Sequence, residues 1–259
     1  PFVFAHEERE STLLQGGIDE TIHEMSFYVT GAALALLIVL AIYAVKKNSH
    51  KKNEKKIQFA ALATVAVLST LFLAGSTLYL NAISPTGGPV HWHTDVEVWN
   101  CGKEVDLVDP VGFSNRVGTW AVHEHNDDRM HIEGTIIDMH QAGFHYFFEA
   151  VGGSVMDSGM IIPTNEGMTM LPASGTCNGQ PSELQAFLFH ITNPNDHKKW
   201  EYTQTKLEYP EGLDTVMSPQ GNIPPGDCLI IENSPPKEKT EHICSSYKYA
   251  IQRGDLHGG

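Results

Sequence analysis

The sequence predicts an α+β protein in which a two-helix transmembrane hairpin is followed by a mostly β extracytoplasmic domain with one or two helices. Three observations lead to this fold class. The chain has two long apolar runs without charge, a short lysine-rich segment between them, and an acidic remainder that has strand-like patterns and holds all four cysteines. We expect a leader over residues 1–24, the hairpin over residues 25–83 and the domain over residues 84–259.

The two apolar runs have the length of membrane spans. Residues 27–45 and residues 59–83 contain no Asp, Glu, Lys or Arg, and a helix rises about 1.5 Å per residue against a hydrocarbon core of roughly 30 Å. Residues 46–56, between them, hold six lysines and one glutamate. Short lysine-rich loops stay in the cytoplasm. The sequence therefore predicts a plasma-membrane protein with the lipid bilayer as a partner and with both termini on the extracytoplasmic side.

Small residues in both spans indicate how the helices pack. Residues 31–35 are GAALA and residues 74–76 are AGS, and small side chains let helices approach closely. A tight two-helix hairpin accounts for them, and docking to a partner membrane-protein subunit is the alternative. Because neither span carries a charged residue, we expect no ion or proton path through them.

The first residues resemble the end of a secretory signal peptide. Residues 1–5 are apolar, and Val3 and Ala5 occupy the positions that signal peptidase prefers. Cleavage after Ala5 would expose His6, whose α-amine and imidazole can chelate one metal ion. The alternative is that His6 is an ordinary residue of a solvated leader, because residues 6–24 carry six acids and Arg9 alone as base.

Charge and cysteine content restrict the partners and the compartment. The net charge of −14 argues against a nucleic-acid partner, which needs clustered Lys and Arg. All four cysteines follow the second span, which fits an oxidising compartment and two disulfides. Four cysteines allow three pairings, of which we favour Cys228–Cys244, closing a short loop, together with Cys101–Cys177. A thiolate metal site is the alternative, but no CxxC spacing supports it.

The domain is predicted to contain more strand than helix. Alternating apolar residues and β-branched runs indicate strands, and apolar residues three and four apart indicate helices. Residues 193–225, rich in Pro, Asn and Gly, are expected to form surface loops. We expect strands at residues 90–99, 104–108, 119–123, 130–137, 184–191 and 228–232, with helices at residues 141–151 and 237–251.

Histidines form the one pattern in the domain that suggests chemistry. The chain has 14 histidines, including the pairs HWH at residues 91–93 and HEH at residues 123–125, followed by HIE at residues 131–133. Side chains alternate along a strand, so two imidazoles at i and i+2 share a face and can bind one ion. The sequence therefore predicts a metal site with the candidate ligands His91, His93, His123, His125, His131 and Glu133.

Other readings of the same histidines remain open. They could form a hydrogen-bonded lattice, or a patch that becomes charged near about pH 6–6.5. Copper or zinc is the expected ion: three histidines with an open position suit zinc, while an exported domain rich in His and Met suits copper. The methionines that favour copper include Met156, Met160, Met168 and Met170.

Three functions follow from this pattern. The first is a membrane-anchored, extracytoplasmic protein for copper or zinc handling, or a metal-binding subunit of a membrane complex. The second is a metal-dependent hydrolase or oxidase with Glu97 or Glu133 as base, although the chain has no nucleophile elbow, phosphate loop or HExxH motif. The third is a structural or adhesive cell-surface domain whose histidines only form hydrogen bonds.

Short stretches of the chain resemble known families. The run PVHWHTDVEVW resembles the first cupin motif, with His91, His93 and Glu97 in the pattern HxHx3E, but the second cupin motif is absent. The two-span anchor, His6 and the HxH pairs are similar to parts of the copper-bearing subunit of membrane methane and ammonia monooxygenases. That resemblance implies copper at His6 and one HxH pair, although the order of domains and spans differs. The whole chain resembles exported, membrane-anchored bacterial proteins with HWH and HEHND motifs, which implies no function.

Overall fold

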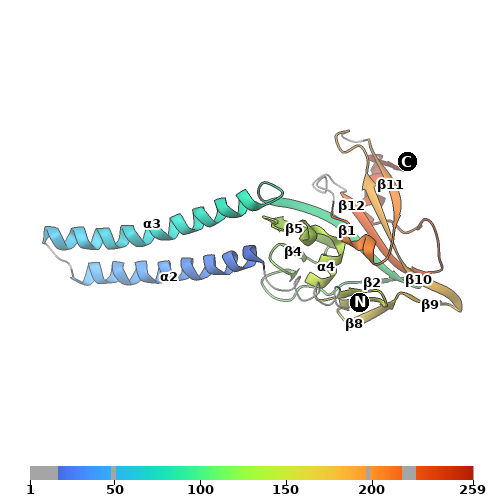
Figure 1. Cartoon of the computed structure of the whole chain (residues 1–259), viewed down its shortest axis with the longest axis horizontal. Helices are drawn as coiled ribbons and strands as arrows, with labels where there is room; N and C mark the ends of the chain where they lie inside the picture. Colours follow the sequence, from blue (N-terminus) through green and yellow to red (C-terminus); the bar gives the residue numbers. More distant parts are fainter. Residues whose placement is uncertain (1–16, 48–50, 197–198, 218–225, 259) are drawn as a thin grey trace, which may run out of the picture. The chain divides into compact units, whose positions relative to one another are not determined.

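The computed structural model describes residues 17–47, 51–196, 199–217 and 226–258, and it confirms the α+β class (Figure 1). The chain divides into two compact units, Pro1–Gly88 and Pro89–Gly259. The first unit contains helices α2 (Ile18–Lys47) and α3 (Lys52–Ile83). Residues 1–5 and His6, for which a signal-peptide end and a metal-chelating N-terminus are expected, lie outside the described residues.

The second unit is mostly β. Its helical elements are η1 (Met139–Ala142), α4 (Phe144–Ala150), η2 (Glu211–Asp214) and α5 (Ser245–Arg253). Its strands are β1 (Val90–Asn100), β2 (Lys103–Val105), β3 (Val117–Gly118), β4 (Val122–Glu124), β5 (Arg129–Gly134), β6 (Ser154–Met156), β7 (Gly159–Thr164), β8 (Gly167–Pro172), β9 (Ser174–Cys177), β10 (Gln180–Ile191), β11 (Trp200–Leu207), β12 (Asp227–Ser234) and β13 (Leu256–Gly258).

Helices α2 and α3 are each long and apolar enough to cross a membrane, and they contact each other. They have 30 and 32 residues and no buried residue, so their apolar side chains are free to meet lipid. Several of their hydroxyl side chains form hydrogen bonds within the helix: Thr70 Oγ1 donates to the carbonyl of Ala66 at 2.8 Å, and Thr77 Oγ1 donates to that of Leu73 at 2.9 Å. Such internal bonding is what an apolar environment requires of a polar group.

The lysine-rich linker is shorter than the sequence suggests. Helix α2 runs on to Lys47 and α3 already begins at Lys52, so much of the expected loop over residues 46–56 is helical. Lys47 Nζ lies 3.4 Å from Glu54 Oε2, which joins the end of α2 to the first turn of α3. This correction has a local cause, because Lys and Glu are good helix formers and continue each helix beyond its apolar part.

The main sheet of the second unit has ten strands in the order β13-β11-β10-β12-β1-β5-β4-β3, with β2 beside β1 and β9 beside β10. Strand β1 is parallel to β12 and β11 is parallel to β13, while the other described pairs are antiparallel. Strands β6, β7 and β8 form a separate three-stranded antiparallel sheet. The strand β1 thus stands between β12 and β5, near the middle of the main sheet.

Apolar side chains pack on both faces of this sheet. On β12, Leu229 and Ile231 belong to one buried cluster, which also contains the aromatic residues of α4. Cys228 and Ile230 point the other way, into a second cluster with Tyr247 of α5. All eight residues of β12 are buried. A strand covered on both faces explains why residues 228–232 are almost continuously apolar.

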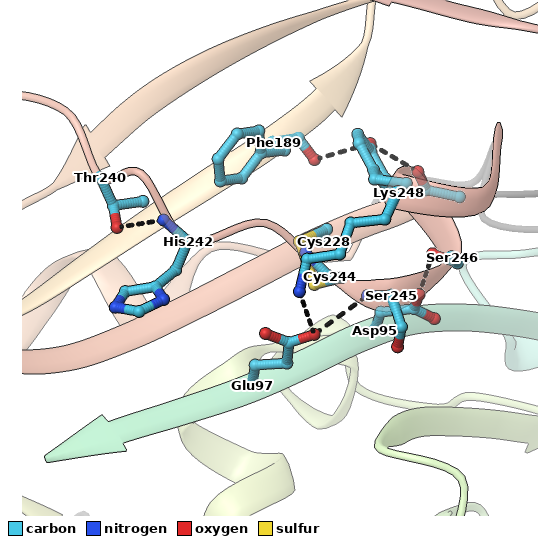
Figure 2. The surroundings of a disulfide bond; sticks show 12 residues. Asp95, Glu97, Phe189, Cys228, Thr240, His242, Cys244, Ser245, Ser246 and Lys248 are labelled. Carbon is cyan, nitrogen blue, oxygen red and sulfur yellow. Dashed lines mark hydrogen bonds and ion pairs between the residues drawn. A yellow bond between two sulfur atoms is a disulfide. The ribbon is translucent and has the colours of Figure 1, made fainter. Parts of the chain in front are cut away.

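Helix α5 covers part of the second face, as Figure 2 shows. The Cys228–Cys244 disulfide fixes the start of α5 to β12. Glu97 of β1 accepts a hydrogen bond from the backbone N–H of Ser245 at 3.0 Å, and Ser246 Oγ donates to Asp95. Burial raises the pKa of both carboxyls, against the lowering effects of Arg129 on Asp95 and of Lys248 on Glu97. These acids therefore anchor α5 to the sheet.

The second disulfide, Cys101–Cys177, joins two tight turns. Cys101 and Gly102 connect β1 to β2, and Asn178 and Gly179 connect β9 to β10. All four have positive φ, from 52° to 82°, as two-residue hairpin turns require. Both disulfides match the pairing that the sequence favours, and no cysteine remains free.

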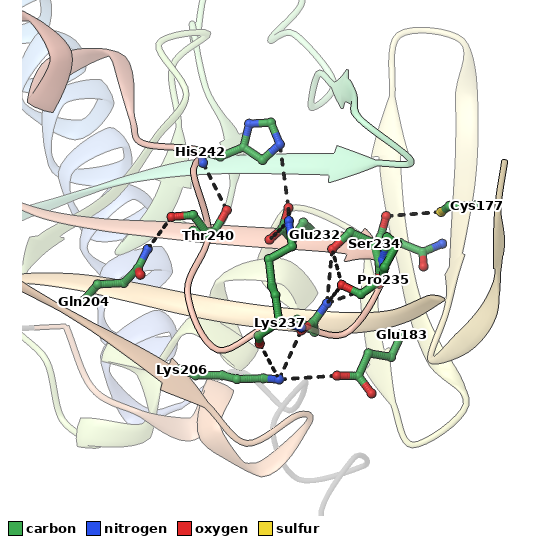
Figure 3. A network of polar contacts seen from close by, with 12 residues as sticks. Cys177, Glu183, Gln204, Lys206, Glu232, Ser234, Pro235, Lys237, Thr240 and His242 are labelled. Atoms are coloured by element: carbon green, nitrogen blue, oxygen red, sulfur yellow. Dashed lines mark hydrogen bonds and ion pairs between the residues drawn. The ribbon is translucent and has the colours of Figure 1, made fainter. Parts of the chain in front are cut away.

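A polar network holds the segment after β12 against β10 and β11, as drawn in Figure 3. Lys206 Nζ donates to the carbonyl of Lys237 at 2.9 Å and to Gln185 Oε1 at 3.1 Å, and it lies 3.3 Å from Glu183 Oε1. The buried Glu232 is paired with Lys237 at 3.2 Å. This network holds residues 235–240 as an irregular connection with bends.

The network also explains a correction to the expected last helix. Residues 237–251 were expected to be helical, but α5 begins only at Ser245 and ends before Gly254, which has a φ of 75°. A second correction concerns residues 193–225, which were expected to be loops but include β11 and η2. Strand β11 does alternate, with Trp200 and Tyr202 half-buried, but the Pro, Asn and Gly residues on both sides of it hide this pattern in the sequence.

Candidate metal centre

The candidate histidines come from three adjacent strands: His91 and His93 from β1, His131 from β5, and His123 from β4, with His125 directly after the end of β4. In the antiparallel pairing of β1 with β5, His93 is opposite His131 and His91 is opposite Glu133. In the pairing of β4 with β5, His123 is opposite His131. The alternate residues of β1 and β5, such as Trp92 and Ile132, are buried in the apolar cluster behind the sheet. Alternation therefore places the imidazoles together on the other face.

The first group of potential ligands consists of His91, His93, His131 and Glu133. One ligand atom from each lies within 4.8 Å of the others. The Nε2 atoms of His91 and His93 are 2.8 Å apart, and His91 Nε2 is 3.3 Å from Glu133 Oε1. The side chain of His91 is 60% exposed. This group can hold a metal ion and is open to solvent on the His91 side.

The second group consists of His123, His125 and the same Glu133, again with ligand atoms within 4.8 Å of one another. The Nε2 atoms of the two histidines are 3.1 Å apart, and His123 Nε2 is 3.8 Å from Glu133 Oε2. His125 Nδ1 contacts the backbone carbonyl of Asn115. Because a carbonyl only accepts, this contact makes Nδ1 the donor and leaves the lone pair of neutral His125 on Nε2, beside His123.

His131 lies between the two HxH pairs. Its ring centroid is 4.6 Å from that of His93 and 4.6 Å from that of His125, and it stacks on His123 at 5.8 Å with an interplanar angle of 3°. His131 Nε2 is 3.1 Å from Asp127 Oδ2. A carboxylate that accepts from one ring nitrogen orients the imidazole and increases the basicity of the other nitrogen, as in many metal sites.

Burial keeps two of the rings neutral at neutral pH. It lowers the pKa of His93 to about 4, with a further contribution from His131, and it lowers the pKa of His123 to about 4, with a further contribution from His125. A neutral imidazole has a lone pair to offer, whereas a protonated one has none.

Two ring nitrogens of the cluster are buried without a hydrogen-bond partner among the described residues. They are Nδ1 of His123 and Nδ1 of His131. A buried polar atom left without a partner costs roughly 1–3 kcal/mol. His123 is only 1% exposed, so bulk water does not compensate. In His131, whose Nε2 lies beside Asp127, the unpaired Nδ1 is the nitrogen left for an ion. His123 faces His125 and Glu133 with Nε2, so its unpaired Nδ1 does not add to the case for a metal.

The structure brings together all six candidates from the sequence. It does not bring Glu97 to them, because that side chain is bound to Ser245 and lies near Lys248 under α5. The cupin-like set of His91, His93 and Glu97 is therefore not a group in this fold. Sequence reasoning missed Asp127 and Asn115. Asp127 could have been found four residues before His131 in the turn of the hairpin, but no local signal indicates the carbonyl of Asn115.

The other described histidines have different surroundings. Glu149 raises the pKa of His145, and Asp227, at 2.9 Å, raises the pKa of His190. His242 stacks on Trp99 at 3.8 Å between centroids. His145 and His190 thus form ion pairs, and His242 packs against an aromatic ring.

The methionines do not strengthen the argument for copper. Met156, Met160, Met168 and Met170 lie in the three-stranded sheet, and Met130 faces the apolar cluster behind β5. The two groups of His and Glu that could hold an ion, among the described residues, offer imidazole and carboxylate ligands. That ligand set suits zinc as well as Cu(II).

Comparison with protein-family models, curated proteins and solved structures gives no match to this chain.

Proposed function

We propose that this chain is a membrane-anchored, extracytoplasmic metal-binding protein that takes copper or zinc at the face of β1, β5 and β4. It acts in metal handling or as a subunit of a membrane complex. The observation that carries the proposal is the convergence of two HxH pairs from separate strands on one carboxylate, Glu133, with every ligand atom of each group within 4.8 Å. Alternation along one strand explains why the two histidines of one pair share a face. It does not explain why two pairs from different strands lie beside the same carboxylate.

The anchor and the compartment are part of the same proposal. Two apolar helices suit insertion in a bilayer, and two disulfides with no free cysteine suit an oxidising compartment. The six lysines of residues 46–56 favour the cytoplasm for the linker between the helices. Together they support a membrane-anchored metal site on the extracytoplasmic side.

Metal analysis tests the binding function. The full chain is purified in detergent through a tag without histidine, stripped with a chelator, loaded with Cu(II) or Zn(II) and dialysed. We expect bound metal in the wild type and its loss in a variant with His91, His93, His123 and His125 all changed to Ala. The matched control changes the exposed His140 and His257 to Ala and should bind as the wild type does. A wild type without metal, or a quadruple variant that retains it, contradicts the proposal.

Cysteine labelling tests the orientation. Lys55 lies in the first turns of α3 and Glu238 lies in the connection between β12 and α5, and both side chains are exposed. We expect a membrane-impermeant maleimide to label Glu238→Cys in intact cells and to label Lys55→Cys only after the membrane is permeabilised. The unsubstituted chain is the control, because its four cysteines are paired. Labelling of Lys55→Cys in intact cells would show the reverse orientation.

A metal-dependent hydrolase or oxidase is the second candidate. The exposed side of His91 favours it, since catalytic metal sites keep an open coordination position. Glu133, whose side chain is 39% exposed, would then be the base beside the metal. The same metal-loaded protein can be assayed against ester, amide and phenolic substrates, and the quadruple variant serves as the control.

A further inference from the structure

We infer that the histidine face holds two metal ions, one at each HxH pair, with the Glu133 carboxylate between them. This inference rests on the proposed function and goes further, because it fixes the number of ions and the role of each ligand. The first ion belongs to His91, His93 and His131, and the second belongs to His123 and His125.

Distances separate the ligands into two sets. Nitrogen ligands of one tetrahedral zinc ion, with bonds of about 2.0–2.1 Å, lie about 3.3 Å from each other. The Nε2 atoms within each HxH pair come near this separation, at 2.8 Å for His91 and His93 and at 3.1 Å for His123 and His125. The six side chains fall into two groups that share Glu133 and do not form one group of six. One ion therefore cannot take both pairs while the side chains keep these positions.

The two oxygens of Glu133 face different pairs. Oε1 is 3.3 Å from His91 Nε2, and Oε2 is 3.8 Å from His123 Nε2. A carboxylate placed in this way can give one oxygen to each ion. Bridging carboxylates are a usual component of two-metal sites, because their negative charge lies between two cations that would otherwise repel each other.

The backbone keeps the two pairs apart and in place. Strand β5, which carries Glu133 and His131, lies between β1 and β4. His91 and His93 are therefore on one side of β5 and His123 is on the other. Antiparallel hydrogen bonding fixes the register on both sides, and contacts with Asn115 and Asp127 orient His125 and His131. Ligands on strands with such supports are held more precisely than ligands on loops.

Counting ions tests the inference. The full chain in detergent is stripped and titrated with Zn(II), then dialysed and analysed. We expect about two ions per chain in the wild type. The variants His91→Ala/His93→Ala and His123→Ala/His125→Ala should each keep about one. Tryptophan fluorescence shows whether each variant is folded, because all four tryptophans lie in residues 89–259.

Loading with Cu(II) gives a second measurement, which compares the wild type with the two double variants and with Glu133→Gln. Two Cu(II) ions joined by one carboxylate couple magnetically, so the integrated EPR signal should fall below two spins per chain and a half-field line should appear. Either double variant should show one uncoupled Cu(II), with the full intensity of a single spin. Glu133→Gln should weaken the coupling in a chain that keeps both HxH pairs.

The outcomes separate this inference from the proposed function. Two ions with magnetic coupling in the wild type support both. One ion in the wild type, without a half-field line, overturns the two-ion arrangement and leaves the metal-binding function in place. A wild type that binds neither Zn(II) nor Cu(II) overturns both.

Discussion

Replacing Cys101 and Cys177 by alanine is expected to lower the free energy of unfolding of the domain by about 4 kcal/mol, because the bond closes a loop with a sequence separation of 76. The cross-link limits the conformations of the unfolded chain, and the limit grows with the length of the loop. Removing Cys228–Cys244, with a separation of 16, should cost less, about 3 kcal/mol. Urea unfolding of the full chain in detergent, followed by tryptophan fluorescence, measures both.

Reductant provides the control for this prediction. When both wild-type disulfides are opened, the difference between the wild type and the Cys101→Ala/Cys177→Ala variant should disappear. If the oxidised wild type and the oxidised variant have the same free energy of unfolding, the Cys101–Cys177 bond does not constrain the unfolded chain.

Changing Phe148 to Ala should destabilise the domain by about 3–5 kcal/mol, which is a large part of the roughly 5–15 kcal/mol that holds a typical domain together. Phe148 is fully buried on α4. Helix α4 contacts β4, and its aromatic residues belong to the same cluster as Val122 and Ile132, whose strands carry the histidines. The same urea experiment measures the loss of stability.

Phe113 offers a matched control, because its side chain is fully exposed. Phe113→Ala is the same chemical change, and its effect should stay within about 0.5 kcal/mol. If the Phe148→Ala and Phe113→Ala variants have the same free energy of unfolding, the prediction that the buried Phe148 stabilises the core is wrong.

Much of the fold follows from local pattern. The uncharged runs predict helices α2 and α3, and the alternation of Trp92, Val96 and Val98 predicts strand β1; the structure confirms these elements. The alternation of β1 also predicts that His91 and His93 share a face. Each of these features depends on residues that are close together in the sequence, so it can be predicted from a single sequence.

Long-range contacts explain what the sequence does not show. Asp95 and Glu97 share a face with His91 and His93, and alternation alone would add them to the site. They are buried instead, because α5, about 150 residues later, covers that half of the face. The opposition of His93 and His131 likewise depends on which strand pairs with β1 and in which register. Neither choice can be read from the spacing of the histidines.

The position of β12 has a consequence for how the protein is made. This strand lies between β10 and β1 and hydrogen-bonds to both, yet it ends only at Ser234. During synthesis β1, β4 and β5 emerge first and can pair with one another, and β10 and β11 can pair later. The two halves of the sheet become one only when β12 has been made and has entered between them. Until then the inner edges of β1 and β10 are unpaired, so we expect chaperones to matter most while the chain between residues 191 and 234 is being made.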